Sequence, residues 1–410
     1  MDVEIQINNS PNANARFITW APAPCRVRVT NPAGAQGQGT PDIRLSGRST
    51  TNGGAVVFRR GTTGAFASSL TLGVPVNGNW VTFFTAGQFG KPSVNLDDVR
   101  IEARKGNGNQ VIGSTPCTVR IRKNANTLST GERDRFVAAF AQLNNRGMGG
   151  FAAFRDMHTN VSSPQAHGRP GFLPWHRAYL LDLERELQAI DPSVALHYWR
   201  FDRPAPNLFK RDFLGDADAT GAVQFSPTNP LQFWATDGVP GIDRLPLFPV
   251  NSAPPGLRTE TQTIALGTAY PAFRVMEGNP HGSAHVSFDG SIDDIGTAAK
   301  DPLFFLLHCN VDRLWAKWQL QNNRFNPAQA ASYDTSASNP IGHNLPDTMW
   351  PWNGITGSPR PPTAPGGPMA SSPCVSAPGP TPRVRDSLDY LGRVNAAALM
   401  GFAYDDVPFS

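Results

Sequence analysis

Apolar and polar residues alternate in a series of short segments that runs through the first 123 residues of the chain. Each segment is rich in β-branched and aromatic residues, and Gly, Asn or Pro separates it from the next, which is typical of strands joined by turns. The segments are VEIQI, CRVRVTN, AVVFRR, SLTLGVPV, WVTFFTAG, VRIEARK and CTVRIRK. About seven strands at this spacing predict a small antiparallel β-sandwich.

Beyond these segments the apolar residues recur at helical intervals instead. Ser129 and Glu132 have the spacing of a capping box before RFVAAFAQLNN, which predicts the start of a helix. Apolar residues between 172 and 190 fall on one face of a second predicted helix. We therefore predict a mainly α fold class, with a helical domain over residues 118–410 that follows a β domain over residues 1–117.

A third predicted helix covers residues 302–320. Asp301 has the position of its N-cap and Pro302 lies in its first turn, where proline is favoured. Residues 334–383 are rich in Pro, Ser and Gly. Such a composition predicts a long irregular segment on the surface rather than a third domain.

The composition is that of an ordinary globular protein, with 410 residues, 40% of them hydrophobic and 17% charged. This length exceeds what one hydrophobic core usually serves, which agrees with two domains. The sequence has no run of about 18 apolar residues, so no membrane span is expected. The start, MDVEIQINNSPN, lacks the basic and then apolar order of a signal peptide. The expected location is the cytoplasm, with export by another route left open.

The net charge of +4 is unevenly distributed. Residues 1–123 hold 14 Lys/Arg and 6 Asp/Glu, and the rest of the chain is net negative. A basic domain is one signature of nucleic-acid binding. However, the arginines lie singly along strand-like segments, apart from the pair Arg59 and Arg60. Solvated strand faces explain this pattern better, and no nucleic-acid partner is expected.

The four cysteines form no C-x-x-C motif, which argues against zinc ribbons and thioredoxin-like redox sites. Cys25 and Cys117 lie in predicted strands near opposite ends of the first domain. Either a disulfide or two buried thiols would fit there. The lack of a signal peptide favours the thiols.

All histidines lie in the predicted helical domain, at positions 158, 167, 176, 197, 281, 285, 308 and 343. His281 and His285 are four residues apart, so a helical turn would place both rings on one face, although such a pair is often a coincidence of the surface. His176 and His308 lie on apolar helical faces. One such histidine is usually a hydrogen-bonded core residue, but several are costly to bury unless they share a partner such as a metal ion.

Carboxylates and cysteines are sparse around these histidines. A set of imidazoles alone suits copper, zinc or iron. Three ligands from each half of the domain would hold two ions. Structural zinc is a weaker alternative, because such sites rarely lack cysteine.

Two longer motifs surround the histidines. HGRPGFLPWHRAYLLDLE resembles the first copper signature of the tyrosinase and catechol oxidase family, and DPLFFLLHCNVD resembles the second. EGNPHGSAH is similar to the family segment that supplies the remaining ligands of the second copper. The resemblance covers roughly residues 118–410, from VRIRKN to GFAYDDVPF, and implies a tyrosinase-like helical bundle around a type 3 site of two copper ions.

The resemblance implies three ligands for each copper: His158, His167 and His176 for the first, and His281, His285 and His308 for the second. His158 is assigned only because it lies upstream of His167. His197 falls in ALHYWRFD where the family has a proline, so a structural role is expected. The same is expected of His343, which lies in the irregular segment.

The implied function is oxidation of small phenolic substrates by dioxygen. o-Diphenols or o-aminophenols would become o-quinones or quinone imines. The alternative is a reversible oxygen carrier like the haemocyanins, which use the same ligand set. Carriers cover their pocket and form large assemblies, whereas the short loop before DPLFF and the lack of any repeat favour the enzyme. The sequence leaves the oligomeric state undetermined.

Three further positions bear on the substrate. Glu277 resembles the family's water-holding glutamate, which could help to deprotonate a phenol. Gly282 stands where efficient monophenol hydroxylases often have an asparagine, so hydroxylation is not favoured. In the loop DIGTAAKDP, Thr297 or Ala298 falls where the family often has a bulky gate residue. We therefore expect an open pocket.

Other family features are also relevant. TNVSSPQA, before His167, has no cysteine for the thioether seen in some members. The chain stops soon after Tyr404, where many members continue into a shielding domain, so the N-terminal β domain is a candidate shield or interaction module. Asp312, one turn after His308, would either orient a ligand or a neighbouring helix, or form a surface ion pair.

Overall fold

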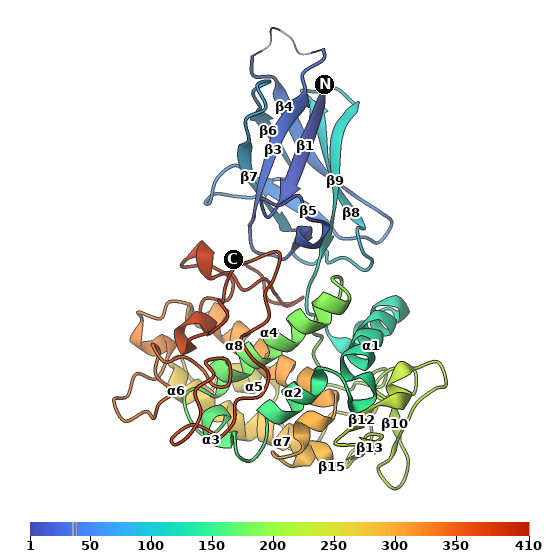
Figure 1. The fold of residues 1–410 in the computed structure, drawn as a ribbon, viewed down its shortest axis with the longest axis vertical. Helices are drawn as coiled ribbons and strands as arrows, with labels where there is room; N and C mark the ends of the chain where they lie inside the picture. The colour runs from blue at the N-terminus through green and yellow to red at the C-terminus, as the bar shows by residue number, and fades with distance from the viewer. Residues whose placement is uncertain (35–36, 38, 410) are drawn as a thin grey trace. The chain divides into compact units, whose positions relative to one another are not determined.

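The computed structural model describes residues 1–34, 37 and 39–409, which form two compact units. The first unit comprises Met1–Ile121, Ser372–Ser376 and Met400–Phe409, and the second comprises Arg122–Ser371 and Ala377–Leu399 (Figure 1). The boundary between the units therefore lies between residues 121 and 122, four residues after the expected boundary between residues 117 and 118. No sequence pattern indicated that the two late segments belong to the first unit.

The first unit has two β-sheets, ordered β1-β3-β7-β5 and β2-β9-β8-β4-β6. All neighbouring strands are antiparallel except β2 and β9, which are parallel. The strands are β1 (Asp2–Ile7), β2 (Phe17–Ile18), β3 (Ala23–Asn31), β4 (Asp42–Ser49), β5 (Val56–Arg59), β6 (Ser69–Gly73), β7 (Val81–Gly87), β8 (Val99–Lys105) and β9 (Val111–Val119). The last strand begins upstream of the predicted CTVRIRK, and β2 is too short to show a pattern.

Alternation along the strands separates a buried face from a charged one. In β3, Cys25 and Val27 are fully buried, whereas the guanidinium groups of Arg26 and Arg28 lie 4.4 and 4.5 Å from the ring of Trp80. Such cation–π contacts account for arginines on a solvated strand face. Cys25 and Cys117 are free buried thiols, and burial raises the pKa of Cys25 to about 12.

The end of the chain completes the first unit. The indole Nε1 of Trp20 donates to the backbone oxygen of Tyr404 at 2.8 Å, and both residues are buried. The thiol of Cys374 lies 3.4 Å from the backbone oxygen of Asn14. The motif GFAYDDVPF, which the sequence assigned to the helical domain, therefore packs with the β-strands.

The second unit is built from helices with three short two-stranded sheets at its margin (Figure 1). The helices are α1 (Thr130–Asn144), α2 (Phe151–Met157), α3 (Ser163–Ala166), α4 (Phe172–Ile190), α5 (Glu260–Ile264), α6 (Tyr270–Phe273), α7 (Ser283–His285) and α8 (Leu303–Asn322). The strand pairs are β10 (Asp216–Ala217) with β11 (Val223–Gln224), β12 (Ala235–Thr236) with β13 (Val239–Pro240), and β14 (Arg244–Pro246) with β15 (Phe288–Gly290).

Local signals set the ends of the long helices. The capping box of Ser129 and Glu132 is present at the start of α1, and α4 covers the predicted residues. Helix α8 begins one residue later than predicted. The Asp301 carboxylate nevertheless accepts a hydrogen bond from the Leu303 backbone nitrogen at 2.9 Å, so it satisfies a free donor of the first turn.

Helices α4 and α8 are joined by a buried ionic network. The Asp312 carboxylate accepts from Arg177 Nε at 2.6 Å and from Arg122 Nη1 at 3.3 Å. Arg122 also pairs with Glu184 at 2.7 Å. Asp312 is only 2% exposed. The alternative of a surface ion pair for Asp312 is therefore wrong, and this carboxylate orients two helices.

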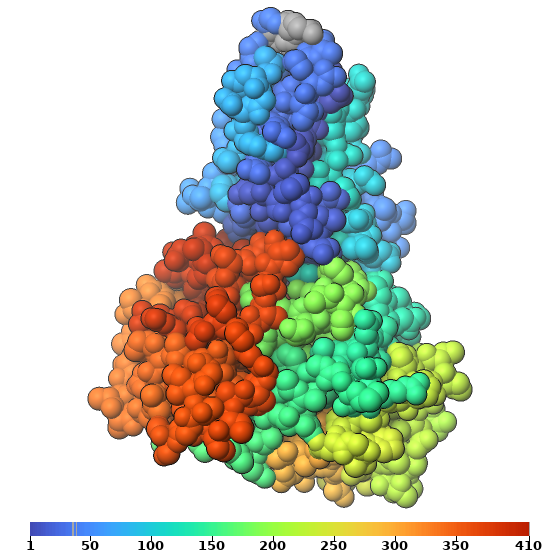
Figure 2. Space-filling model, in the orientation of Figure 1, coloured from blue at the N-terminus to red at the C-terminus, as the bar shows by residue number. Residues whose placement is uncertain are grey.

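Residues 334–383 form neither helix nor strand, as the sequence predicted. Their part in the second unit, drawn in orange, covers much of the face of that unit seen in Figure 2. Helix accounts for 28% of the chain and strand for 20%, so the expected mainly α class describes the whole chain only loosely. Within the described part of the chain, every helix is too short or too polar to cross a membrane.

Candidate metal centre

Three elements position the first group of histidines. His158 ends the short helix α2, and His167 follows α3 in the loop HGRPG. His176 lies one turn into α4, where its Nδ1 donates to the Phe172 backbone oxygen at 2.9 Å. The ring of His176 is thus held by the helix that carries it.

The second group is built mostly from local helical spacing. His281 belongs to a π-turn, Gly278–Gly282, and His285 ends the short α7 that follows. Their ring centroids are 4.8 Å apart, as the four-residue spacing predicts. His308 lies inside α8 and is fully buried.

The six imidazoles meet at one place in the second unit. Nε2 of His308 lies 3.3 Å from Nε2 of His281 and 3.2 Å from that of His285. Nε2 of His158 lies 3.3 Å from that of His167. The structure thus brings together every histidine that the sequence proposed as a ligand.

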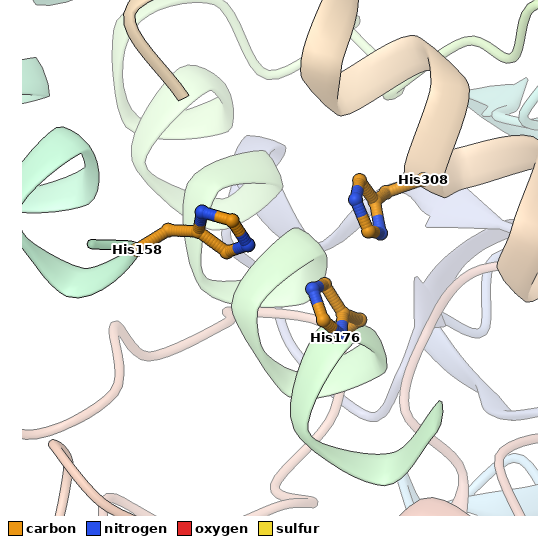
Figure 3. A group of neighbouring side chains, drawn as sticks. All are labelled: His158, His176 and His308. Atoms are coloured by element: carbon orange, nitrogen blue, oxygen red, sulfur yellow. The ribbon is translucent and has the colours of Figure 1, made fainter. Parts of the chain in front are cut away.

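Two tight groups occur within this cluster, and they differ from the expected division. His158, His176 and His308 form one, and His281, His285 and His308 form the other, with ligand atoms within 4.8 Å of one another in each. Figure 3 shows the first group, whose rings project from three elements toward a common space. His308 belongs to both groups and stacks on His176 with ring centroids 4.1 Å apart, whereas His167 belongs to neither.

The rings are neutral and turn one nitrogen inward. Nδ1 of His158 donates to the Ile295 carbonyl at 3.1 Å, and Nδ1 of His285 donates to the Ile292 carbonyl at 2.8 Å. A carbonyl accepts only, so Nδ1 carries the proton and Nε2 keeps its lone pair. Burial is the main cause that lowers the pKa of His158 to about 3 and of His285 to about 4, with help from neighbouring imidazoles at His158.

This donor set fits copper ions. Nε2 of His176 is buried and receives no hydrogen bond from the described residues, so its lone pair is available to a metal ion. Burial and nearby imidazoles also lower the pKa of His167 to about 2. Neutral imidazole is a suitable donor for copper, and hydrogen bonds from the outer nitrogen fix its orientation.

The loop that carries His167 is held by side chains distant in the sequence. His343 Nδ1 accepts from the Gly171 backbone nitrogen at 3.1 Å, and its Nε2 donates to the Pro164 carbonyl at 2.9 Å. A Cβ on Gly171 would lie 2.5 Å from His343 Nδ1, so this close approach requires glycine. Tyr270 donates to the Pro170 carbonyl at 2.5 Å.

Glu277 is a third support of the same loop. One carboxylate oxygen accepts from the Gly168 backbone nitrogen at 2.5 Å, and the other lies 3.1 Å from Arg274 Nη1. Burial raises the pKa of this carboxyl. The motif resemblance implies that Glu277 holds a water molecule. In the structure its carboxylate instead accepts a hydrogen bond from the loop that carries His167.

The metal centre opens into a cavity of about 290 Å³, close to the lower end of the roughly 300–1,000 Å³ typical of small-molecule sites. It is lined by His158, His167, Glu277, His281, Gly282, His285, Val286, Asp293, Ile295 and Ala298. Among the described residues Thr297 does not line it, because its hydroxyl turns to the Ser291 carbonyl at 2.8 Å. Of the two residues expected near the gate position, Thr297 and Ala298, the one that lines the cavity is Ala298.

His197 has a different environment. Its Nδ1 accepts from the Lys123 backbone nitrogen at 3.2 Å, and its ring contacts Phe136 with centroids 5.2 Å apart. These contacts are those of a structural core residue.

Comparison with known proteins supports this description. A family model for the common central domain of tyrosinase matches residues 148–321. The tyrosinase of Streptomyces glaucescens is 35% identical over 262 residues, which cover 57% of this chain and 92% of the relative. That of Streptomyces antibioticus is 33% identical over 267 residues, covering 58% and 94%. Among solved structures, deoxygenated hemocyanin from Rapana thomasiana aligns over 70% of each chain with 22% identity and a TM-score of 0.48.

The buried imidazoles and the sequence matches define a type 3 copper protein, whose cofactor is a pair of copper ions. The chain belongs to the tyrosinase family. It is a tyrosinase-like copper enzyme that oxidises phenolic substrates with dioxygen. The residues that match the family domain all lie in the second unit.

Proposed function

We propose that this chain oxidises o-diphenols or o-aminophenols to o-quinones or quinone imines. The observation that carries the proposal is a cavity beside six neutral imidazoles in which the gate position holds only the methyl group of Ala298. In the overall reaction, two molecules of catechol each lose two electrons and two protons, and one dioxygen becomes two water molecules. The copper pair, when bound, supplies the two-electron redox chemistry.

The proposed ligands are His158, His167 and His176 for one copper, and His281, His285 and His308 for the other. Backbone carbonyls that accept from the outer nitrogens would hold four of these rings, those of His158, His176, His281 and His285, in place as the substrate enters. Such preorganisation matters because a ligand that must reorient for each turnover slows the reaction.

Apolar side chains of the cavity would receive the substrate ring. Val286 and Ile295 are 59% and 42% exposed and line the cavity together with Ala298. An aromatic ring buries its apolar faces against such walls, and its hydroxyl groups then point toward the imidazoles. Small substituents on the ring are tolerated because the gate position is small.

Monophenol hydroxylation is not part of the proposal. Both oxygens of the Glu277 carboxylate are engaged, by Gly168 and Arg274, and Gly282 has no side chain that could help to hold a water. A Cβ on Gly282 would meet only the Glu277 backbone oxygen at 3.4 Å, an ordinary contact. Gly282→Asn is therefore expected to fold and to increase the ratio of monophenol to diphenol activity.

The test compares initial rates of the copper-loaded protein on catechol, o-aminophenol and tyrosine. We expect quinone or quinone-imine formation from the first two and little hydroxylation of tyrosine. Strong tyrosine hydroxylation without a lag would contradict the role given to Gly282. Reversible dioxygen binding with no product from any of the three would favour an oxygen carrier instead.

A further inference from the structure

The lining of the substrate cavity has an uneven charge. Two of its ten residues are carboxylates, Glu277 and Asp293, and none is a lysine or an arginine. The others are four histidines, which are neutral, and four residues without a charge. Among the protein side chains that line this cavity, the charged ones are therefore all acidic, and they lie beside the positive charge that bound copper ions would bring.

The two carboxylates differ in their partners. Glu277 is compensated by Arg274, with which it forms an ion pair at 3.1 Å. Asp293 is exposed, and within the described part of the chain its carboxylate makes no hydrogen bond or ion pair. Asp293 thus supplies the uncompensated charge at the cavity.

The backbone around Asp293 is fixed relative to the metal centre. Ile292, directly before it, accepts from His285, and Ile295, two residues after it, accepts from His158. The hydroxyl of Thr297 donates to the Ser291 carbonyl and braces the same loop. The backbone that carries Asp293 is therefore anchored to ligands of both proposed copper sites, and both Asp293 and Ile295 line the cavity.

We propose that Asp293 sets the substrate preference, so that phenols with a positively charged side chain are favoured over phenols with a carboxylate. The proposal rests on the proposed diphenol oxidase function. The aromatic ring would occupy the apolar part of the cavity, and an ammonium group on a short side chain would lie near the Asp293 carboxylate. The attraction acts on binding and capture of the substrate, and involves no bond to the metal centre.

The expected effect is moderate because Asp293 is exposed to solvent. Attraction between exposed charges typically raises a binding constant by at most roughly fivefold. Repulsion of an anion lowers it by a similar factor. The ratio between matched cationic and anionic substrates should therefore reach about fivefold or more. The net charge of the whole chain, +4, would by itself favour the anion, so the sign of the ratio distinguishes the local charge from the global one.

The test measures kcat/KM of the copper-loaded full-length protein at pH 7 for dopamine, 4-ethylcatechol and 3-(3,4-dihydroxyphenyl)propionate. These substrates share one ring and differ in side-chain charge. We expect the order dopamine, then 4-ethylcatechol, then the propionate. In 0.5 M NaCl the ratio of the first to the last should shrink, since salt screens exposed charges. A ratio of one or below in the unmodified protein would overturn the proposal.

Two variants test whether the charge preference comes from Asp293. Asp293→Asn should bring the ratio of dopamine to the propionate to within about twofold. The matched control is Asp289→Asn, which removes the same charge from an exposed residue of β15 that is not among the cavity-lining residues. The control should keep the full ratio. An equal loss of preference in both variants, or no loss in Asp293→Asn, would show that Asp293 does not set it.

Binding of ligands that cannot be oxidised separates this proposal from the proposed function. 2-Phenylethylamine should bind more tightly than 3-phenylpropionate by calorimetric titration, and Asp293→Asn should remove the difference. If 4-ethylcatechol is not oxidised, the proposed function fails, while this pair of ligands still tests Asp293. If 4-ethylcatechol is oxidised but the pair binds equally, the charge preference alone is wrong.

Discussion

The histidines proposed as ligands of the two copper ions reach the same place by different means; His158, His167 and His176 form one group, and His281, His285 and His308 form the other. His281 and His285 lie on one turn, and His308 lies inside a long helix, so backbone geometry fixes all three. In the other group, His167 lies on a loop that is held by Tyr270 and other side chains far away in the sequence. A group fixed by helical geometry should tolerate distant substitutions, whereas a group fixed by tethers should lose its metal when a tether is removed.

The largest effect is expected for His308, whose ligand atom lies within 4.8 Å of those of His158 and His176 and also of those of His281 and His285. His308→Ala removes a ring that lies against His176, His281 and His285. Removing a hydrogen-bond partner of a metal ligand already lowers metal affinity or activity by about 10- to 100-fold. Loss of the ligand itself should therefore reduce catechol turnover by more than about a hundredfold. Bound copper per chain should fall well below that of His167→Ala, which removes a ligand at the edge.

Copper analysis of the two purified variants checks this expectation, with circular dichroism as the control for folding. Equal copper loss in His308→Ala and His167→Ala would show that both groups depend on every ligand alike. The shared position of His308 would then have no functional meaning.

The next largest effect concerns the helices that carry His176 and His308. Asp312→Ala leaves the guanidinium of Arg177 buried without its carboxylate, and breaking such a pair typically costs about 3–5 kcal/mol. The urea midpoint of the second unit should fall accordingly. Asp289→Ala is the control, because Asp289 is exposed and its carboxylate makes no hydrogen bond or ion pair with the described residues, so its loss should cost much less. A similar midpoint shift in both variants would show that the network does not join the helices.

A tether of the His167 loop is expected to have a smaller effect that is specific to one copper. His343→Ala leaves the Gly171 nitrogen and the Pro164 carbonyl without their partner, at a cost of about 1–3 kcal/mol. Affinity for one copper of the two should fall by roughly 10- to 100-fold. His343→Asn should restore part of it, since the amide oxygen can accept from Gly171.

His197→Ala provides the matched control for His343→Ala. Both rings are buried and accept from a backbone nitrogen, but His197 binds Lys123 rather than the loop. Both variants should be less stable to urea. Only His343→Ala should release copper at a concentration of chelator that leaves the unmodified protein loaded, and equal release would refute the tether.

Local patterns were sufficient to predict much of the fold, whereas the six histidines of the cluster were assigned through the resemblance to the tyrosinase family, His158 from its position upstream of His167 alone. The capping box of Ser129 and the bounds of α4 depend on neighbouring residues alone, and so they were visible in the sequence. The hydrogen bonds of Tyr270 and His343 to the loop join residues that are 100 and 172 positions apart in the sequence. The sequence around a single tyrosine or histidine does not indicate such a distant partner. The side-chain direction at Thr297 depends on a hydrogen bond within its loop, which spacing does not reveal.

The late segments of the first unit were missed for the same physical reason. Trp20 and Tyr404 are 384 residues apart, and the motif around Tyr404 resembled a piece of the helical domain. A shielding or interaction role of the first unit stays a prediction.

The smallest expected effect is the loss of a single hydrogen bond to the loop. Tyr270→Phe removes the donor to the Pro170 carbonyl and should lower stability by about 1 kcal/mol. Tyr333→Phe is the matched variant, because its hydroxyl donates to the His343 carbonyl at 2.8 Å and so acts on the tether rather than on the loop. The two should cost similar stability, but release of one copper to a chelator should be faster in Tyr270→Phe. Release of both coppers at the same increased rate would contradict the distinction between a tethered group and a helical group of histidines. In that case a change at the loop would also have weakened copper binding by the histidines that backbone geometry holds.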